Sequence, residues 1–101
     1  MSRRIELQTI FEGILGSENV YFQPPENLKM KYDCIVYERS RIDADHADNA
    51  PYHLHDRYQV TAIYKNPDSE LPHKIAMLPM CSHERHFTAD NLNHDVFNLY
   101  Y

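Results

Sequence analysis

The chain has 101 residues, 43% of them hydrophobic, with a formal net charge of −5 and a pI near 5.7. This length supports one domain over residues 1–101 with one hydrophobic core, and the acidic balance excludes a surface built to bind nucleic-acid phosphates. There is no apolar run of about 18 residues, so we expect neither a membrane helix nor a signal peptide, and we expect an intracellular protein.

The first 16 residues are typical of an amphipathic helix. Apolar residues recur at positions 7, 10, 11, 14 and 15, a spacing that places them on one side of a helix. Ser2 can cap its start, and Gly16 can end it because glycine readily adopts the left-handed conformation common at helix C-termini. We therefore expect a helix that packs on the core through its apolar side.

The stretch ENVYFQ at residues 18–23 fits the recognition pattern of a viral protease used to remove tags, so it could be a cloning scar. In such a scar Gly or Ser usually follows the glutamine, whereas Pro24 stands here. We interpret the stretch as native. Val20 and Phe22 alternate with more polar neighbours, which predicts a short strand that the two following prolines end.

Two longer strands are predicted over residues 31–42 and 52–64. The first contains the β-branched and aromatic run YDCIVY, and the second alternates apolar and polar residues from Tyr52 to Tyr64. Between them, DADHADNAP is polar, acidic and rich in turn-forming residues. We expect a long hairpin whose loop spans residues 43–51 and has a mobile tip.

A second helix and two further strands complete the predicted fold. Asp68 and Ser69 can cap a short helix that a proline at position 79 stops. Its apolar side would consist of Leu71, Ile75 and Leu78. Residues 80–88 and 95–101 are predicted strands around the loop ADNLN. The expected order is α-β-β-β-α-β-β, an α+β fold with a mostly antiparallel sheet and two helices on one face.

The last predicted strand is strongly apolar. Residues 96–101 contain Val, Phe, Leu and two Tyr, and no polar tail follows them. An open apolar edge strand invites uncontrolled pairing, so this strand must be covered. The cover can come from its own sheet or from a neighbouring subunit.

Seven histidines raise the question of a metal or catalytic site. Cys81, His83 and His86 form a C-x-H-x-x-H pattern, and His53 and His55 share one face of a predicted strand. In a regular strand, however, His86 points away from His83, so these ligands do not converge. We predict no metal site and interpret the histidines as surface or hydrogen-bonded groups.

Other catalytic patterns are equally weak. The acidic residues at 43, 45 and 48 lack the Gly and the distal Glu of an EF-hand loop, and no P-loop, G-x-S-x-G or Gly-rich dinucleotide turn occurs. Cys34 and Cys81 are interpreted as two buried thiols. We predict no catalytic residue and no cofactor. A His-Asn-His cluster at 83, 86, 93 and 94 leaves a small metal-dependent hydrolase or nuclease as the alternative.

Four stretches carry a family resemblance: NVYFQPP, MKYDCIVY, YQVTAIYKNPDSELPHKIAMLPM and RHFTADNLNHDVFNLYY, in that order. Together they resemble small proteins from the head–tail region of long-tailed bacteriophages and prophages, of the tail-terminator or tail-completion type. The resemblance covers nearly the whole chain and contains no catalytic motif. It implies an α+β fold and a virion structural protein that is not an enzyme.

The resemblance further implies a ring, commonly sixfold, that caps the finished tail tube and docks onto the head connector. The partners would be copies of the chain itself, tail-tube protein and head-connector proteins, with no membrane involved. The location would be the tail or neck of the virion, and the bacterial cytoplasm before assembly. A head-closure protein of the same neck region is an alternative.

A ring needs a heterologous interface, in which one patch of each subunit meets a different patch of the next. We expect strand edges and tyrosines to form it, and the acidic hairpin tip to contact a tube or connector subunit. The candidate interface residues are Asp43, Asp45, His46, Asp48, Tyr52, Tyr58, Tyr64, Val96, Phe97, Leu99, Tyr100 and Tyr101.

Genome DNA would pass through such a ring without being read by sequence. If Asp and Glu side chains line the lumen, they would repel DNA phosphates, and the repulsion would multiply with the number of subunits. The alternative is that the acidic residues serve mainly solubility.

Overall fold

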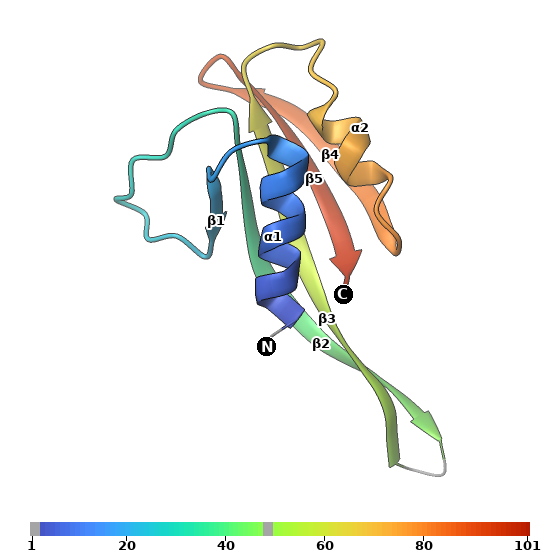
Figure 1. The fold of residues 1–101 in the computed structure, drawn as a ribbon. Helices are drawn as coiled ribbons and strands as arrows, with labels where there is room; N and C mark the ends of the chain where they lie inside the picture. The colour runs from blue at the N-terminus through green and yellow to red at the C-terminus, as the bar shows by residue number, and fades with distance from the viewer. Residues whose placement is uncertain (1–2, 48–49) are drawn as a thin grey trace.

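The computed structural model describes the backbone of residues 3–47 and 50–101 and the side chains of residues 4–40 and 56–101. Two helices and one five-stranded sheet make up the fold (Figure 1). The elements are α1 (Arg3–Leu15), β1 (Val20–Phe22), β2 (Cys34–Ala47), β3 (Ala50–Tyr64), α2 (Leu71–Ala76), β4 (Cys81–Ala89) and β5 (Leu92–Tyr100). The predicted α+β class and element order are confirmed.

The strands lie in the order β1-β2-β3-β5-β4. β1 pairs with β2 in parallel, and the other neighbours are antiparallel. Both helices lie on the same face of the sheet, as Figure 1 shows. The core forms between this face and the helices, and its largest fully buried side chains are Tyr37, Tyr58, Phe11, Phe97, Leu7, Ile35 and Ile75.

Helix α1 follows the predicted amphipathic pattern. Leu7 and Phe11, one turn apart, are buried at the centre of its apolar side. The ring of Phe11 meets Tyr37 of β2 edge to face at 5.1 Å between centroids. Gly16 ends the helix at φ = 78°, and its N–H donates to the carbonyl oxygen of Glu12 at 2.9 Å. The predicted cap, Ser2, lies outside the described residues.

The long hairpin differs from the prediction at its loop. The prediction of a loop over Asp43–Pro51 was wrong, because β2 continues to Ala47 and β3 begins at Ala50. Backbone pairing runs through the polar stretch, with Asp43 opposite His55 and Asp45 opposite His53. Local turn propensity is a weak preference, which the cooperative antiparallel ladder overrides here. The expected tip, at residues 48 and 49, lies outside the described residues.

The distal part of this hairpin forms an arm, which we define as residues 42–47 and 50–55. β3 pairs with β5 only from Arg57 to Tyr64, and the backbone N–H of Tyr101 donates to Asp56. Beyond that point, the described pairing of β3 is with β2 alone. In Figure 1 the arm leaves the sheet and extends well past the end of α1. The molecule is correspondingly elongated, with extents of 50 × 24 × 23 Å.

The chain between β3 and β4 holds α2, which is shorter than predicted. It ends at Ala76, before the expected stop at residue 79. The predicted cap at Asp68 or Ser69 was wrong by one to two residues, because the N-cap is Glu70, which makes no side-chain cap hydrogen bond. Ser69, just before it, accepts a hydrogen bond from the backbone N–H of Leu71 at 3.2 Å. Leu71 and Ile75 are buried, and they anchor α2 on the core.

The last hairpin is tighter than predicted. Its turn consists of Asp90 and Asn91, with φ of 53° and 63°, so the five-residue loop over 89–93 was wrong. Positive φ at both central positions defines a type I′ turn, whose twist matches that of the flanking strands. β5 thus starts at Leu92 and lies between β3 and β4. The apolar stretch 96–101 is therefore covered by its own sheet and is not an edge.

The contact between α1 and the sheet should dominate the stability of the fold. Replacing Phe11 by Ala removes a fully buried ring and leaves a cavity under α1, so we expect the free energy of unfolding to fall by about 3–5 kcal/mol. Replacing Ile5, which is 45% exposed on the same helix, by Ala should cost less than about 1 kcal/mol. Urea denaturation followed by circular dichroism measures both, and equal losses would contradict this assignment of the core.

Candidate functional site

A bulge in β4 brings two histidines together. His83 is opposite Phe97, Arg85 is opposite Val96, and the register shifts between His83 and Arg85. The extra residue reverses the alternation of the strand, so that His83 and His86 both reach Asp95 of β5. The prediction that His86 points away from His83 was therefore wrong, because it assumed a regular strand.

Asp95 is the centre of this cluster and is 5% exposed. Its Oδ1 lies 2.9 Å from Nε2 of His83 and 3.0 Å from Nδ1 of His86. The hydroxyl of Tyr64 donates to Oδ2. Burial alone would raise the pKa of Asp95, but the hydrogen bonds from Tyr64 and both histidines outweigh it and hold the pKa below its ordinary value.

The pKa of Tyr64 shifts in the opposite direction from that of Asp95. Burial, followed by its hydrogen bond to Asp95 and the negative charge of that carboxylate, raises the pKa of Tyr64 to about 12. The phenol therefore stays protonated at neutral pH and acts as a donor. The cluster ties β3, β5 and the edge strand β4 together at a position where α2 begins to cover the sheet.

Whenever the two imidazoles are neutral, the carboxylate also sets their tautomers. It accepts hydrogen bonds only, so Nε2 of His83 and Nδ1 of His86 carry the donated protons. Both rings are almost half exposed, at 45% and 46% of their side-chain surface. Beside them lies a cavity of about 310 Å³, whose wall includes Ser69 and His73. Among the side chains that the structure describes, no group of three or more His, Cys, Asp or Glu is arranged to hold a metal ion.

The sequence prediction did not include Asp95. A signal was present, because an aspartate begins the predicted apolar strand directly before Val96 and Phe97, and a buried carboxylate requires partners. The partners could not be identified, because a bulge is not visible in the sequence.

Most of the predicted interface residues with described side chains are internal. Five of them are at most 4% exposed and belong to the monomer's core: Tyr58, Tyr64, Val96, Phe97 and Leu99. They are not available to a partner. Tyr100 and Tyr101 are half-buried. Asp43, Asp45, His46 and Tyr52 lie in the arm, where the structure describes the backbone alone, and Asp48 lies outside the described residues.

The two cysteines are free thiols. Cys34 is fully buried, and burial, followed by the charge of Asp33, raises its pKa to about 12. Cys81 is half-buried, and burial raises its pKa as well. Since the thiolate is the nucleophile, neither group is activated for catalysis.

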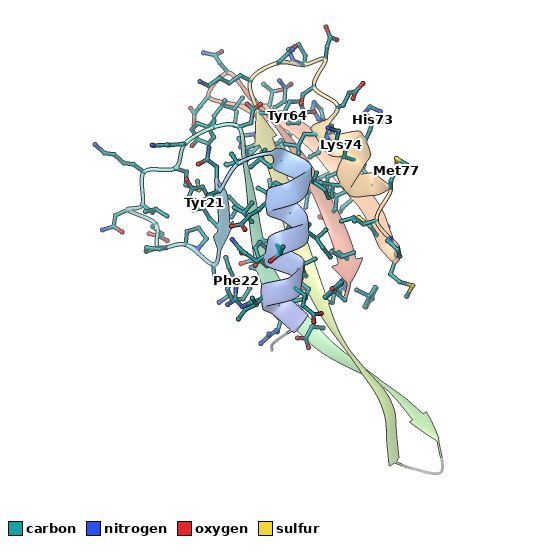
Figure 2. The ribbon with its side chains drawn as sticks, in the orientation of Figure 1. Tyr21, Phe22, Tyr64, His73, Lys74 and Met77 are labelled. Carbon is teal, nitrogen blue, oxygen red and sulfur yellow. The ribbon has the colours of Figure 1, made fainter. Side chains whose placement is uncertain are left out.

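An apolar groove lies on the helix side, where α1, the segment after α2 and the end of β5 meet. Its volume is about 360 Å³, and its lining residues are Leu7, Ile10, Leu78, Pro79, Met80, Leu99, Tyr100 and Tyr101. Met80 is 66% exposed. Met77, one residue before Leu78, is also largely exposed but does not line the groove, and Figure 2 shows it on the outer side of the α2 end of the molecule.

The opposite face of the sheet has a different character. Phe87 of β4 stacks on His94 of β5 at 4.6 Å between centroids, and the guanidinium of Arg85 lies 5.5 Å from the ring of Phe87. A shallow depression of about 310 Å³ beside them includes Glu38 and Gln59 in its wall. Phe87 is exposed on this mixed polar and aromatic face, whereas the groove on the helix side is lined mainly by apolar residues.

Comparison with known protein families, curated proteins and solved structures finds no match to this chain. Neither helix in the described part of the chain is long and apolar enough to span a membrane. The functional interpretation therefore depends on the geometry of the surfaces and on the sequence resemblance.

The charge of Asp95 should stabilise the fold in a pH-dependent way. Because its folded-state pKa is lowered, this stabilisation is present above about pH 5 and is lost as the pH falls below the ordinary Asp value of about 3.9. We expect Asp95→Asn to lower the free energy of unfolding by about 1–3 kcal/mol at pH 7, and the difference from wild type to shrink below about pH 4.

Denaturant titrations between pH 3 and pH 7 measure this difference. Asp90→Asn is the matched control, because it makes the same chemical change in an exposed turn. A pH-independent difference for Asp95→Asn, or an equal effect of the control, would contradict the role given to the carboxylate.

Proposed function

We propose that this chain is a virion structural protein of a long-tailed phage or prophage, which forms a ring at the head-proximal end of the tail tube and joins it to the head connector. The observation that carries the proposal is the arm. It is a two-stranded ribbon whose described pairing beyond Arg57 is internal. An isolated two-stranded hairpin is at best marginally stable in water, so an arm of this length needs a partner surface.

The body of the molecule supports the same proposal. The exposed methionines and the apolar groove provide a second surface that the monomer leaves uncovered. One chain thus carries two different unfilled surfaces, which is the requirement for a heterologous interface that closes into a ring. The resemblance to tail-terminator and tail-completion proteins supports the assignment to the phage neck, with the tail-tube and connector proteins as the further partners.

The alternative of a metal-dependent hydrolase has less support. Its strongest residues, His83 and His86, both donate to one buried carboxylate oxygen when neutral. A metal ion bound between these three groups would have to replace those hydrogen bonds. A head-closure protein would use the same kind of surfaces, but it would bind the connector and leave the tail tube uncapped.

Electron microscopy of purified protein with tail-tube subunits tests the proposal. We expect rings, and tubes capped at one end. In the matched control variant, an Asn-Gly turn replaces residues 43–55, so that Ile42 stays paired with Asp56 across a two-residue hairpin.

The shortened chain should lose the circular dichroism signal of the arm strands but keep a cooperative unfolding transition, because the arm contributes nothing to the described core. It should lose rings and caps. Full-length protein that stays monomeric and leaves tubes uncapped at every ratio of the two proteins would reject the proposal.

A further inference from the structure

The cluster around Asp95 carries a single net negative charge whenever its two imidazoles are neutral. Asp95 is 5% exposed, and it accepts hydrogen bonds from Tyr64, His83 and His86. These hydrogen bonds replace the lost hydration of the carboxylate, but a phenol and two neutral imidazoles bring no positive charge. A buried charge without a counter-charge is costly, so this position favours a bound cation.

A cavity of about 310 Å³ lies beside this carboxylate, between the sheet and α2. Much of its wall is apolar and consists of Pro67, Pro72, Ala76 and Phe97. Figure 2 shows Tyr64, at the end of β3, and His73, on α2, at the same end of the molecule; both line the cavity. Apolar walls with a few polar groups are typical of small-molecule sites, and the volume lies at the lower end of their usual range of about 300–1,000 Å³.

Three residues of the wall carry a hydrogen-bond acceptor with a lone pair that the described contacts do not use. Oδ2 of Asp95 accepts from the hydroxyl of Tyr64 and has a second lone pair. Oγ of Ser69 accepts from the N–H of Leu71 and likewise has a second one. Neutral His83 donates through Nε2, so its Nδ1 is an acceptor. A primary ammonium group has three N–H donors and no acceptor, and it matches this set.

We infer that the cavity binds a primary alkylammonium ion, with the nitrogen beside Asp95 and the alkyl chain against the apolar wall. An ammonium group would add to the hydrogen bonds of the cluster, whereas a metal ion between the same groups would have to replace them. The net charge of −5 on the chain also favours a cation over an anion. This inference goes beyond the proposed ring and does not depend on it.

A nuclear magnetic resonance titration of the full-length, ¹⁵N-labelled protein with n-butylammonium chloride tests the site. At about pH 8, where histidine is neutral, we expect saturable shifts of the backbone amides of Ser69, His73, His83 and Asp95. A probe with so few non-hydrogen atoms should bind with a dissociation constant on the order of 1 mM. Saturable shifts that are absent, or that lie elsewhere in the protein, would overturn the inference.

Two further probes separate the charge from the hydrogen bonds. Tetramethylammonium has the same charge without an N–H donor, and n-butanol has the same alkyl chain without the charge. Each should bind at least about tenfold more weakly than n-butylammonium, because each lacks one of the two interactions. Equal binding of either probe would reject a site for primary ammonium groups.

Variants of the wall locate the bound nitrogen. Asp95→Asn should weaken n-butylammonium binding by at least about tenfold, because it removes the buried charge. The matched control is Asp68→Asn, which removes an exposed carboxylate outside the cavity and should weaken binding by less than about twofold. Equal effects of the two variants would contradict the role of Asp95.

A second variant keeps the test valid if Asp95→Asn is too unstable to study. Ala76 is exposed on α2 and lines the cavity, so Ala76→Leu should narrow the cavity without changing the core. We expect at least about fivefold weaker binding of n-butylammonium, because the larger side chain takes the space of the alkyl chain. Met77→Leu, at the next residue and outside the cavity, is the control. Unchanged binding to Ala76→Leu would reject this cavity as the site.

Binding should also depend on pH, because a protonated His83 or His86 would supply the missing positive charge. The titratable and charged groups around the cavity are Tyr64 of β3, His83 and His86 of β4, Asp95 of β5, His73 and Lys74 of α2, and Asp68 and Glu70 before α2. Between about pH 8 and pH 5.5 histidine is the side chain that gains charge, so n-butylammonium should bind about tenfold more weakly at the lower pH. Replacing both His83 and His86 by Gln should remove most of this loss, and His73→Gln should keep most of it. Wild-type binding that does not change with pH would contradict the inference.

The ammonium group can belong to a free amine or to a lysine side chain of another protein. Nα-acetyl-lysine N-methylamide presents the same alkylammonium group on a peptide backbone and distinguishes the two sources. Binding tighter than that of n-butylammonium would assign the site to lysine side chains. Exclusion of the lysine derivative while n-butylammonium binds would assign it to free amines. A protein that binds n-butylammonium but caps no tail tubes would retain this site and reject the proposed function.

Discussion

The antiparallel ladder between β2 and β3 is the interaction on which the rest of the structure depends. Its inner half supplies Tyr37, Tyr58 and Val60 to the core beneath α1. Its outer half leaves the body as the arm. Because the two halves are one continuous pair of strands, the packed core holds the arm in a defined direction. A surface element that would be marginal alone is thus anchored to the packed core of the molecule.

The helices cover one face of the sheet, and this one-sided arrangement determines where polar and apolar groups can lie. α1 and α2 bury the aromatic side of β2, β3 and β5. Near α2 the apolar cover gives way to Asp95, whose negative charge is compensated by Tyr64 and two histidines. A buried carboxylate is tolerated only with such partners, and the bulge in β4 brings both histidines within hydrogen-bonding distance of it. We interpret the cluster as a set of hydrogen bonds that holds the edge strand β4 on the sheet.

The monomer leaves two features without cover from its own chain in the described residues. The arm is a two-stranded ribbon beyond Arg57, and the apolar groove lies where α1, the segment after α2 and the end of β5 meet. The proposed ring assembly is based on these two features. The exposed rings of His83 and His86 have fixed tautomers when neutral, but the groups around them do not supply an activated nucleophile among the described side chains.

The sequence by itself determined the order and type of the elements, because periodicity reports directly which side of a helix or strand is buried. The stripe through Leu7 and Phe11, the alternation from Tyr58 to Tyr64 and the stop at Gly16 are local signals, and each is found in the structure. The sequence also showed that residues 96–101 had to be covered, without showing whether the cover was the sheet or another subunit.

Only the tertiary structure decided the pairing of distant segments. In the structure β5 lies inside the sheet, and β2 and β3 continue through a stretch with strong turn propensity. A bulge in β4 brings His83 and His86 to Asp95. Tyr58 and Tyr64, predicted to lie at an interface, are buried in the core. The physical reason is that strand pairing is non-local: its register depends on contacts between residues far apart in the chain, and a shift of one residue changes which side chains meet.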